Sequence, residues 1–415
     1  MTQVAASSEQ PPAAKEEHPF GSPPRDLPHW QPPELAADSD VLVQAVDLSQ
    51  RAERARFLDV ADVVLGGDPN YISPLRFERM KFLDTGKNPA LSALDIQAFV
   101  ATRRGRLVGR ITAHIDRAYN DYHGVRVGWF GFFDSIDDQK VAHALLDRAV
   151  RWVKAQNVTE IIGPCNFTTN HQVGLLVENF ARPATVEMTY NASYYEKLVT
   201  SYGFGRAKDL LAFWMDVSAG LADPKIKRFH DISEKVKTRY GLSIRGARMA
   251  DFEREVALLF RLYNETWQKN WGFVPVSESE FHQIASDLKQ VVDPDLVLIV
   301  EDRERQPVAF SVTLPNVNEI MPKNGRLFPF GWWSLVTGMK RIKTARLMVL
   351  GVAPGHRKHG VEAMLCIETA LRASRRGCSS GEISWTLEDN LLINRTVESF
   401  GGRLDRRYRL FGLAL

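Results

Sequence analysis

The chain has 415 residues, of which 44% are hydrophobic and 25% are charged, and its formal net charge is +3. This is a globular composition whose length predicts two domains, and the small charge does not indicate a nucleic-acid partner. Three cysteines, Cys165, Cys366 and Cys378, follow no metal-ligand spacing, so we expect reduced thiols, no metal site and a cytoplasmic protein. Neither a signal peptide nor an apolar run of roughly 18–20 residues is found, so we expect at most peripheral contact with the inner membrane face.

Residues 1–38 contain eight of the 21 prolines and almost no aliphatic pattern. A segment of this composition cannot bury enough apolar surface to fold, so we expect a disordered leader. Periodic structure begins near Val41.

The first half, residues 39–220, alternates helical and strand patterns. A tight turn at Arg104-Gly105-Arg106 joins two of the strands into a hairpin. The predicted elements are a helix at 49–65, strands at 96–103, 107–115 and 127–136, a helix at 138–156, a strand at 160–164, a helix at 193–201 and a strand at 210–217.

The second half, residues 221–415, repeats that order. Its predicted elements are a helix at 252–270, a hairpin at 296–314, a strand at 345–352, a helix ending at 375, a strand at 382–386, a helix at 390–400 and a strand at 408–413. The repetition predicts an α/β (α+β) fold of two similar domains, each with a mixed, mostly antiparallel sheet flanked by helices.

The loop in "LMVLGVAPGHRKHGVEAMLC", residues 347–366, lies between a predicted strand and helix and carries several positive groups. A helix N-terminus binds anions through its free N–H groups, Gly360 allows a ligand to approach the backbone, and Arg357 and Lys358 add charge. Strand, loop and helix together indicate a pyrophosphate site. Neither a Walker loop nor a dinucleotide fingerprint is present, and the alternative is an ordinary solvated loop with a basic face. The equivalent loop of the first half, residues 134–139, is acidic and would repel a pyrophosphate, which assigns the site to the second half.

Polar residues are dense in "GPCNFTTNHQVGLL", residues 163–176. We expect Asn166, Thr168 and Asn170 to bind the polar part of a substrate in a cleft wall, and His171 to be a candidate base. The alternative is that these side chains only cap and cross-link the loop.

An unusually long connection, residues 315–346, separates the second hairpin from its next strand. Its uncharged centre, residues 328–339, includes Trp332 and Trp333, and the basic residues Lys340, Arg341, Lys343 and Arg346 follow. Aromatic and basic residues together are typical of an anionic membrane surface, or of a lid over a long acyl chain. An additional core helix is the alternative.

Two motifs resemble those of the GNAT (GCN5-related N-acetyltransferase) superfamily. "Arg357-Lys-His-Gly360-Val" resembles Arg/Gln-x-x-Gly-x-Gly/Ala, with Glu362 at the last position, and residues 390–401 resemble Asn-x-x-Ala-x-x-x-Tyr-Glu-x-x-Gly, with Val397 in place of tyrosine. "Ser193-Tyr-Tyr-Glu-Lys-Leu-Val-Thr-Ser-Tyr-Gly-Phe" of the first half has a similar character.

This resemblance implies acyl-CoA as a co-substrate, with no permanently bound cofactor. Backbone groups at Leu350 and Val352 would face the thioester in a gap between the strands at 345–352 and 382–386. The cofactor would be held by Arg357, Lys358, His359, Gly360, Val361 and Asn390. The amine must lose a proton, for which Glu382, Asp389 and His356 are candidates beside His171.

Nearly the whole ordered chain resembles a bacterial group of tandem GNAT-like proteins. Stretches that carry the resemblance include "GWFGFF", "GPCNFTTNHQVGLLVE", "NWGFVP" and "NGRLFPFGWW". Some members of the group look like bacterial ceramide synthases, which implies transfer of a fatty acyl group to the lipidic amine of a sphingoid base, with Trp332 and Trp333 beside the lipid. The alternatives are acylation of an amino acid, peptide or cell-wall precursor, and a non-catalytic acyl-CoA-binding regulator.

Overall fold

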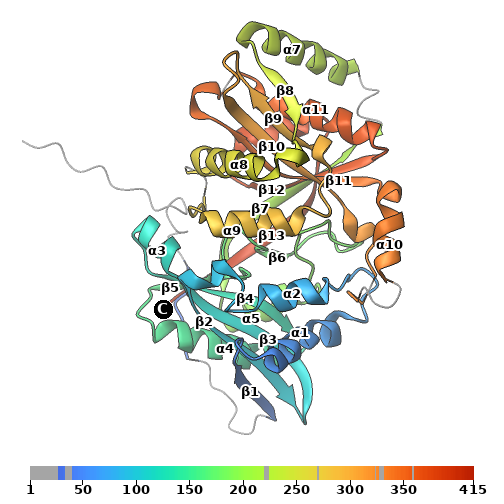
Figure 1. Ribbon diagram of the computed structural model, residues 1–415. Coiled ribbons are helices and arrows are strands. Elements are labelled where there is room, and N and C mark those ends of the chain that lie inside the picture. The colour runs from blue at the N-terminus through green and yellow to red at the C-terminus, as the bar shows by residue number, and fades with distance from the viewer. Residues whose placement is uncertain are drawn as a thin grey trace, which may run out of the picture.

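The computed structural model describes residues 27–32, 40–218, 224–268, 271–322, 324–326, 331–357 and 359–415. Its N-terminal half, blue to green, and its C-terminal half, yellow to red, lie one above the other (Figure 1). A single sheet runs through both halves. Within these described ranges, no helix combines the length and the apolar character that crossing a membrane requires.

The first half begins with β1 and ends with β7. Its elements are β1 (Val41–Val46), α1 (Arg51–Leu65), α2 (Arg76–Phe82), β2 (Leu94–Arg103), β3 (Arg106–Asp116), α3 (Arg117–His123), β4 (Val127–Ser135), α4 (Gln139–Lys154), β5 (Glu160–Gly163), β6 (Leu175–Leu176), α5 (Tyr195–Tyr202) and β7 (Gly205–Asp216).

The second half follows the same plan. Its elements are α7 (Pro224–Tyr240), β8 (Ser243–Gly246), α8 (Phe252–Trp267), α9 (Glu278–Leu288), β9 (Val297–Glu301), β10 (Pro307–Pro315), α10 (Gly331–Gly338), β11 (Thr344–Val352), α11 (Val361–Arg375), β12 (Ser380–Leu387), α12 (Leu391–Ser399) and β13 (Arg403–Ala414). Apart from α3, β6, α7 and α10, the two halves share one order of strands and helices. The predicted fold class and its internal duplication are confirmed.

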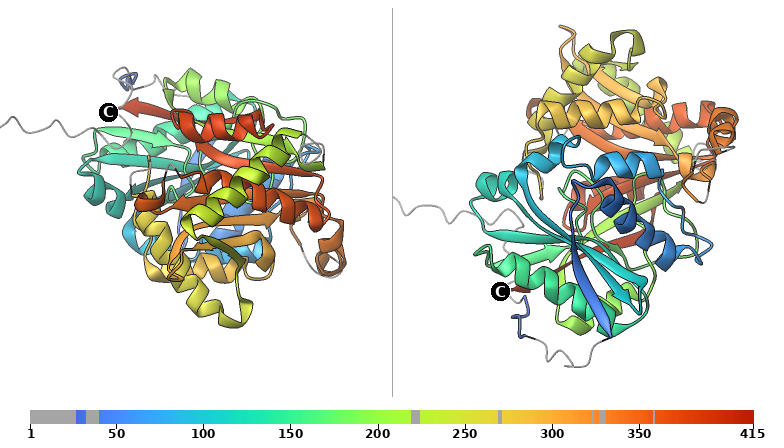
Figure 2. Two further views of the ribbon diagram at one scale, coloured as in Figure 1. Left: turned by 90° about the horizontal axis from the view of Figure 1, so that it is seen from above. Right: turned by 60° about the horizontal axis from the view of Figure 1, so that its bottom comes forward.

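The last strands of the two halves change places. Along the sheet the order is β1-β2-β3-β4-β5-β13-β7-β12-β11-β10-β9-β8. Strand β13 of the second half pairs with β5 of the first, and β7 of the first half pairs with β12 of the second. The crossing strands are visible where the two halves meet (Figure 2). Each half therefore completes its sheet with backbone hydrogen bonds from the other.

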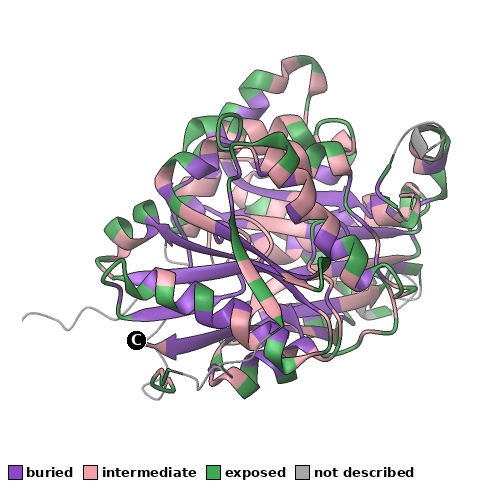
Figure 3. Cartoon of the chain, turned by 90° about the horizontal axis from the view of Figure 1, so that it is seen from below, coloured by how far each residue is buried: buried purple, intermediate pink, exposed green. Residues whose placement is uncertain are grey.

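Side-chain alternation explains how helices cover both faces of the first half. In β2, Phe99 and Ala101 belong to the apolar cluster that contains Val141 and Leu145 of α4. The residues that alternate with them, Ala98 and Val100, pack with α1 on the opposite face. Alternate residues of a strand point to opposite faces. The strands are consequently buried between helices whose outer faces are exposed (Figure 3).

Residues 27–32 fall within the segment that we expected to be disordered, yet they pack on the folded chain. The N–H of Trp30 donates to the carbonyl of Ala414, and its indole Nε1 donates to the Tyr202 hydroxyl at 3.0 Å. The indole ring also lies 4.6 Å from the Lys154 ammonium. The expectation is corrected for this stretch, while residues 1–26 and 33–38 of the predicted leader lie outside the described ranges.

Candidate active site

The predicted gap between β11 and β12 is present. The two strands are parallel and pair only from Thr344 with Ser380 to Leu347 with Ile383. Met348 is skipped in the register between β11 and β10, so it forms a bulge. A bulge bends its strand and increases its twist. The end of β11 therefore separates from β12 directly after Leu347.

Leu350 and Val352 direct their backbone groups into this gap. The N–H of Ala353 donates to the carbonyl of Val308 on the β10 side at 2.8 Å. Since alternate residues of a strand face opposite neighbours, Val352 and Leu350 face the side from which β12 has departed. Free N–H groups in such a gap are suited to stabilise an oxyanion.

The cationic loop after β11 ends at Gly360. This glycine is the N-cap of α11 and has the left-handed conformation, with φ 81° and ψ 15°. Val361 follows as a buried residue, and the His359 ring stacks on Tyr240 of α7 with 4.5 Å between centroids. The first turn of α11 thus has backbone N–H groups for which the helix supplies no carbonyl acceptor. Such N–H groups can bind an anion.

Arg357 is turned back onto the protein. Its Nε donates to the carbonyl of Val352 at 3.0 Å, and its Nη2 donates to the carbonyl of Thr266 at 2.6 Å. The side chain therefore ties the end of β11 to α8, and we expect its main role to be structural. Lys358 lies outside the described residues.

A cavity of about 670 Å³ lies between the two halves. Met348 and Val349 of β11 and Trp385 of β12 line it, so it reaches the gap. One wall, the apolar wall, comes from β10, α8, α9 and their flanking segments. It consists of Met249, Phe252, Val256, Leu259, Ile284, Leu288, Val291, Phe310, Val312 and Leu314. The opposite wall comes from α1, α2, the end of β4 and the polar segment 166–172. This volume and mixed lining are typical of a small-molecule site.

The polar segment contributes four predicted residues, of which Asn166, Asn170 and His171 line the cavity. The Asn170 side-chain oxygen accepts a hydrogen bond from the Tyr263 hydroxyl of α8 at 2.8 Å, which joins the two halves. Thr168 lies behind the wall, with its Oγ1 3.0 Å from Nδ1 of His171. The segment thus forms a shared wall, as expected, and it also has the cross-linking role of the alternative.

His171 is partly buried at the cavity wall and packs edge-on against Phe82, with 4.9 Å between ring centroids. Desolvation, assisted by the charge of Arg79, lowers the pKa of His171 to about 3. The imidazole is therefore neutral at physiological pH. It can accept a hydrogen bond or donate one, but a pKa this low makes it a weak base.

In the first half, the chain itself fills the equivalent gap. Strands β4 and β5 pair only from Val127 to Trp129. Beyond that point, the N–H of Cys165 donates to the Phe130 carbonyl at 2.7 Å, and the Asn166 side-chain oxygen accepts from the Phe132 N–H at 2.7 Å. The backbone groups that face the gap in β11 therefore correspond to groups of β4 that are hydrogen-bonded within the first half.

Other predicted site residues have local partners. Glu382 is 1% exposed and accepts hydrogen bonds from the hydroxyls of Thr185 at 2.6 Å and Ser384 at 2.7 Å. Asn390 caps α12 by accepting from the Ile393 N–H at 3.4 Å. Neither Glu382, Asn390 nor His356 lines the cavity described above.

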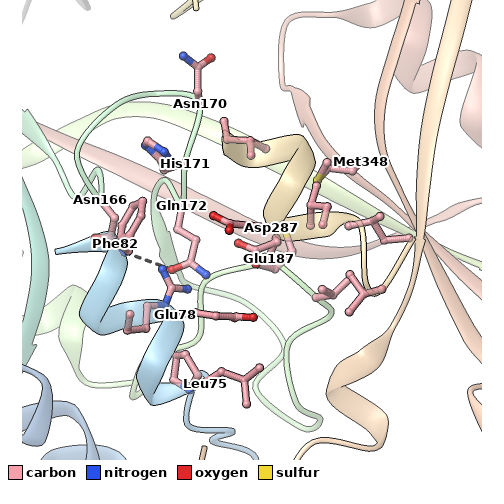
Figure 4. Close-up of a pocket in the computed structure, with 18 of the residues that line it drawn as sticks. Leu75, Glu78, Phe82, Asn166, Asn170, His171, Gln172, Glu187, Asp287 and Met348 are labelled. Carbon is pink, nitrogen blue, oxygen red and sulfur yellow. Dashed lines mark hydrogen bonds between the residues drawn. The ribbon is translucent and has the colours of Figure 1, made fainter. Parts of the chain in front are cut away.

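Three carboxylates in the cavity were not predicted. Glu78 of α2, Glu187 of the loop before α5 and Asp287 of α9 lie toward one another beside Met348 (Figure 4). The cavity and nearby like charges raise the pKa of Glu78 to about 7, with burial as the largest cause and Glu187 as the next. For α9 a signal exists in the sequence, because Ser277 and Glu280 have capping-box spacing and the Ser277 hydroxyl does accept from the Glu280 N–H.

The long connection forms the short helix α10. Trp333 is 60% exposed, and the neighbouring Lys340, Arg341 and Lys343 are exposed as well. Leu335 of the same helix lines the cavity. The side chain of Trp332 lies outside what the structure describes.

Arg346 corrects the predicted basic cluster, because it is 4% exposed instead of lying on the surface. Its guanidinium donates to Ser384 Oγ at 2.9 Å, to the Ser384 carbonyl at 3.1 Å and to the Val186 carbonyl at 2.8 Å. Arg346 therefore connects β11 and β12 to the loop that carries Glu187.

Two curated proteins match the chain over most of their length. The bacterial ceramide synthase of Caulobacter vibrioides (strain NA1000 / CB15N) is 35% identical over 383 residues, which are 90% of this chain and 98% of that protein. The chain belongs to the family of this protein. Protein YghO of Escherichia coli (strain K12) is 38% identical over 352 residues, 83% of this chain and 88% of that protein. No family model matches the chain.

Solved structures agree on the fold of this family. A tandem GNAT protein from the clavulanic acid biosynthesis pathway, solved without AcCoA, has a TM-score of 0.54 at 12% identity and covers 90% of this chain and 98% of its own. A GCN5-related glucosamine N-acetyltransferase region of a fungal multi-domain GH3 β-N-acetylglucosaminidase has a TM-score of 0.50 at 14% identity, over 90% of this chain and 38% of its own. The chain is an acyltransferase with a tandem GNAT fold.

Proposed function

We propose that the protein transfers a long-chain acyl group from acyl-CoA to the amine of a sphingoid base and forms an amide. The observation that carries this proposal is the 35% identity to the bacterial ceramide synthase, which extends over 98% of that protein. The cavity supports it, because one wall is apolar and the other is polar and carries carboxylates. A lipidic amine needs surroundings of both kinds.

In this proposal each half of the chain binds one of the two substrates. Residues 221–415 bind acyl-CoA, which is a co-substrate and not a resident cofactor, and residues 39–220 form the acceptor side. The open gap at β11 and the first turn of α11 support the first assignment. The internally filled gap at β4 supports the second. The pyrophosphate would lie on the backbone from Arg357 to Val361, with His356 and Asn390 at its periphery.

The acyl chain would extend from the gap along the apolar wall. Burial of one methylene group contributes about 0.8 kcal/mol, so each added pair of carbons raises affinity by about tenfold where the wall can accept it. A site built for acetyl groups would gain nothing from this surface. We therefore expect a strong preference for long-chain thioesters.

Peripheral contact with an anionic membrane at the cytoplasmic face belongs to the same proposal. The exposed Trp333 and the exposed Lys340, Arg341 and Lys343 support it, since aromatic and basic groups are favoured at the headgroup layer. Such contact would bring the cavity near both lipidic substrates.

The test is to incubate the purified protein with acetyl-, octanoyl- or palmitoyl-CoA and sphinganine, and to analyse products by mass spectrometry. We expect the N-acyl product with palmitoyl-CoA, and release of free thiol only when the amine is present. Turnover of an amino acid or peptide amine in preference to sphinganine would overturn the acceptor assignment. Binding of acyl-CoA without thiol release to any amine would indicate a regulator.

A further inference from the structure

Three of the carboxylates that line the cavity come from separate segments of the chain. Glu78 lies on α2, Glu187 on the loop between β6 and α5, and Asp287 on α9, and Figure 4 shows them around one space beside Met348 of β11. Met348 is the bulge at which the gap opens. The cavity that these carboxylates line therefore reaches the place where a thioester would lie.

Two of these carboxylates have no partner among the described residues. Asp287 forms an ion pair with Lys81 at 2.9 Å. No hydrogen bond or ion pair links Glu78 or Glu187 to any part of the chain that the structure describes. Among the other cations of the cavity, Arg110 pairs with Asp134 at 2.7 Å and Arg79 lies over the Phe82 ring. Glu78 and Glu187 are thus available to a ligand.

A fourth carboxyl group adds to the acidic character of the cavity. Glu280 precedes Asp287 by two turns on α9, lines the same cavity and is only 8% exposed. Its Oε1 is buried and has no hydrogen-bond partner in the described protein. A buried carboxyl group without a partner is costly and is retained mainly where a ligand or a proton compensates for it. Desolvation, with the charge of Asp116 acting in the same direction, raises the pKa of Glu280 to about 7, so a proton or a cationic group can supply this compensation.

The backbone around Glu187 is fixed in an unusual conformation. Glu187 has φ 58°, which is strained for a residue with a side chain. Its neighbour Val186 is held on both sides, because its N–H donates to the Asn316 side chain at 2.9 Å and its carbonyl accepts from Arg346. The second half therefore positions Glu187 of the first half.

Glu78 is poised to exchange a proton near neutral pH. Glu78 is exposed to solvent at the cavity wall, but partial desolvation there raises its pKa to about 7, with the charges of Glu187 and Asp287 acting in the same direction. Arg79 and Lys81, on the same helix, act in the opposite direction. The carboxylate form that accepts a proton thus dominates only above about pH 7, where general-base catalysis is efficient.

We propose that Glu78 and Glu187 bind the ammonium group of the acceptor and that Glu78 is the general base of the acyl transfer. This inference rests on the proposed acyl transfer from acyl-CoA and adds the amine site to it. It assigns the deprotonation step to α2 and not to His171, Glu382 or His356.

The proposed acyl transfer begins with deprotonation of the acceptor. The Glu78 carboxylate takes one proton from the ammonium group and leaves a neutral amine. The amine nitrogen forms a bond to the thioester carbonyl carbon, and the carbonyl electron pair moves to oxygen. The C–S bond then breaks, the second proton of the nitrogen passes to the departing thiolate, and the products are an amide and the free thiol of coenzyme A. Glu78 finally releases its proton to solvent.

The principal test is Glu78→Gln, which removes the base and keeps its size. We expect kcat at saturating amine to fall by about 10²- to 10⁴-fold. The thermal midpoint and the affinity for a non-hydrolysable thioether analogue of palmitoyl-CoA should not change. Glu304→Gln, in the exposed turn between β9 and β10, is the matched control and should behave like the parent protein. A Glu78→Gln variant that keeps activity within tenfold overturns the proposal.

Glu187→Gln supplies a second readout. It tests the proposal even if the Glu78→Gln variant does not fold. Removal of a neighbouring negative charge lowers the pKa of Glu78, so the acid limb of the kcat/KM profile should move to lower pH and KM for the amine should rise. A limb that stays in place or moves to higher pH overturns the proposal.

The proposed acceptor and the proposed role of Glu78 can be refuted separately. If sphinganine is not acylated but another amine is, the acceptor assignment is lost, and the same variants test Glu78 with that amine. If no amine is acylated, both are lost.

Discussion

Replacement of Gly360 by alanine tests whether coenzyme A binds at the first turn of α11. An alanine Cβ would lie 3.6 Å from the nearest atom, Cγ2 of Val236, which is an ordinary contact. The substitution therefore adds no clash, and its cost comes from the backbone. A residue with a side chain loses about 1–2 kcal/mol in the left-handed conformation that Gly360 has, φ 81°.

This strain should appear as one of two measurable losses, in stability or in affinity for coenzyme A. If α11 keeps its first turn, unfolding free energy falls by the full 1–2 kcal/mol. If the turn relaxes to avoid the strain, at least one charge-assisted hydrogen bond to the pyrophosphate is lost, at about 1.5–3 kcal/mol. That loss corresponds to a rise of about 10- to 150-fold in Kd. We expect a rise within this range, because the loop is free to relax toward solvent.

The assay is calorimetric titration with coenzyme A, combined with urea unfolding. Gly355→Ala, five residues earlier in the same loop, is the control, because its Cβ would meet no atom within 4 Å and its φ is not positive. We expect the control to bind coenzyme A as the parent protein does. Equal affinities in Gly360→Ala and Gly355→Ala would refute the assignment of the pyrophosphate to this helix start.

Three further substitutions test other parts of the molecule. Arg346→Met leaves the Ser384 and Val186 carbonyls buried and unpaired, so unfolding free energy should fall by about 2–6 kcal/mol in urea titration, and a loss under 1 kcal/mol would contradict the connecting role of Arg346. Trp30→Ala removes a hydrogen bond and cation–π contacts and should cost about 2–3 kcal/mol; an unchanged thermal midpoint would show that residues 27–32 are dispensable. Trp333→Ala should leave stability unchanged and weaken binding to anionic vesicles in a flotation assay, whereas undiminished flotation would exclude membrane contact through α10.

Local sequence patterns were sufficient for the fold because the repeated units are built from local signals. The hairpin of β2 and β3 turns at Arg104 and Gly105, both with positive φ, as a two-residue hairpin turn requires. The gap at β11 followed from the motif that begins at Arg357. The exchange of β7 and β13 could not be predicted, since pairing between distant strands leaves no local pattern.

The amine site was missed for a related reason. Helix α2 has only seven residues and no buried residue among them, so it lacks an apolar period. Glu187 lies in an irregular loop, and its position depends on contacts with Asn316 and Arg346 of the other half. Charge alone also misled the prediction of a surface position for Arg346, because a charged residue within an apolar strand can be satisfied by distant partners.

The exchanged strands have a mechanical consequence for catalysis. Two domains on a flexible linker can hinge apart to admit substrates, but here the hydrogen bonds of β7 with β12 and of β13 with β5 cross the boundary in both directions. Separation of the halves would break the sheet at its centre. Substrates therefore reach the cavity from its solvent-exposed side, where Glu78 and Asp287 lie, without separation of the two halves.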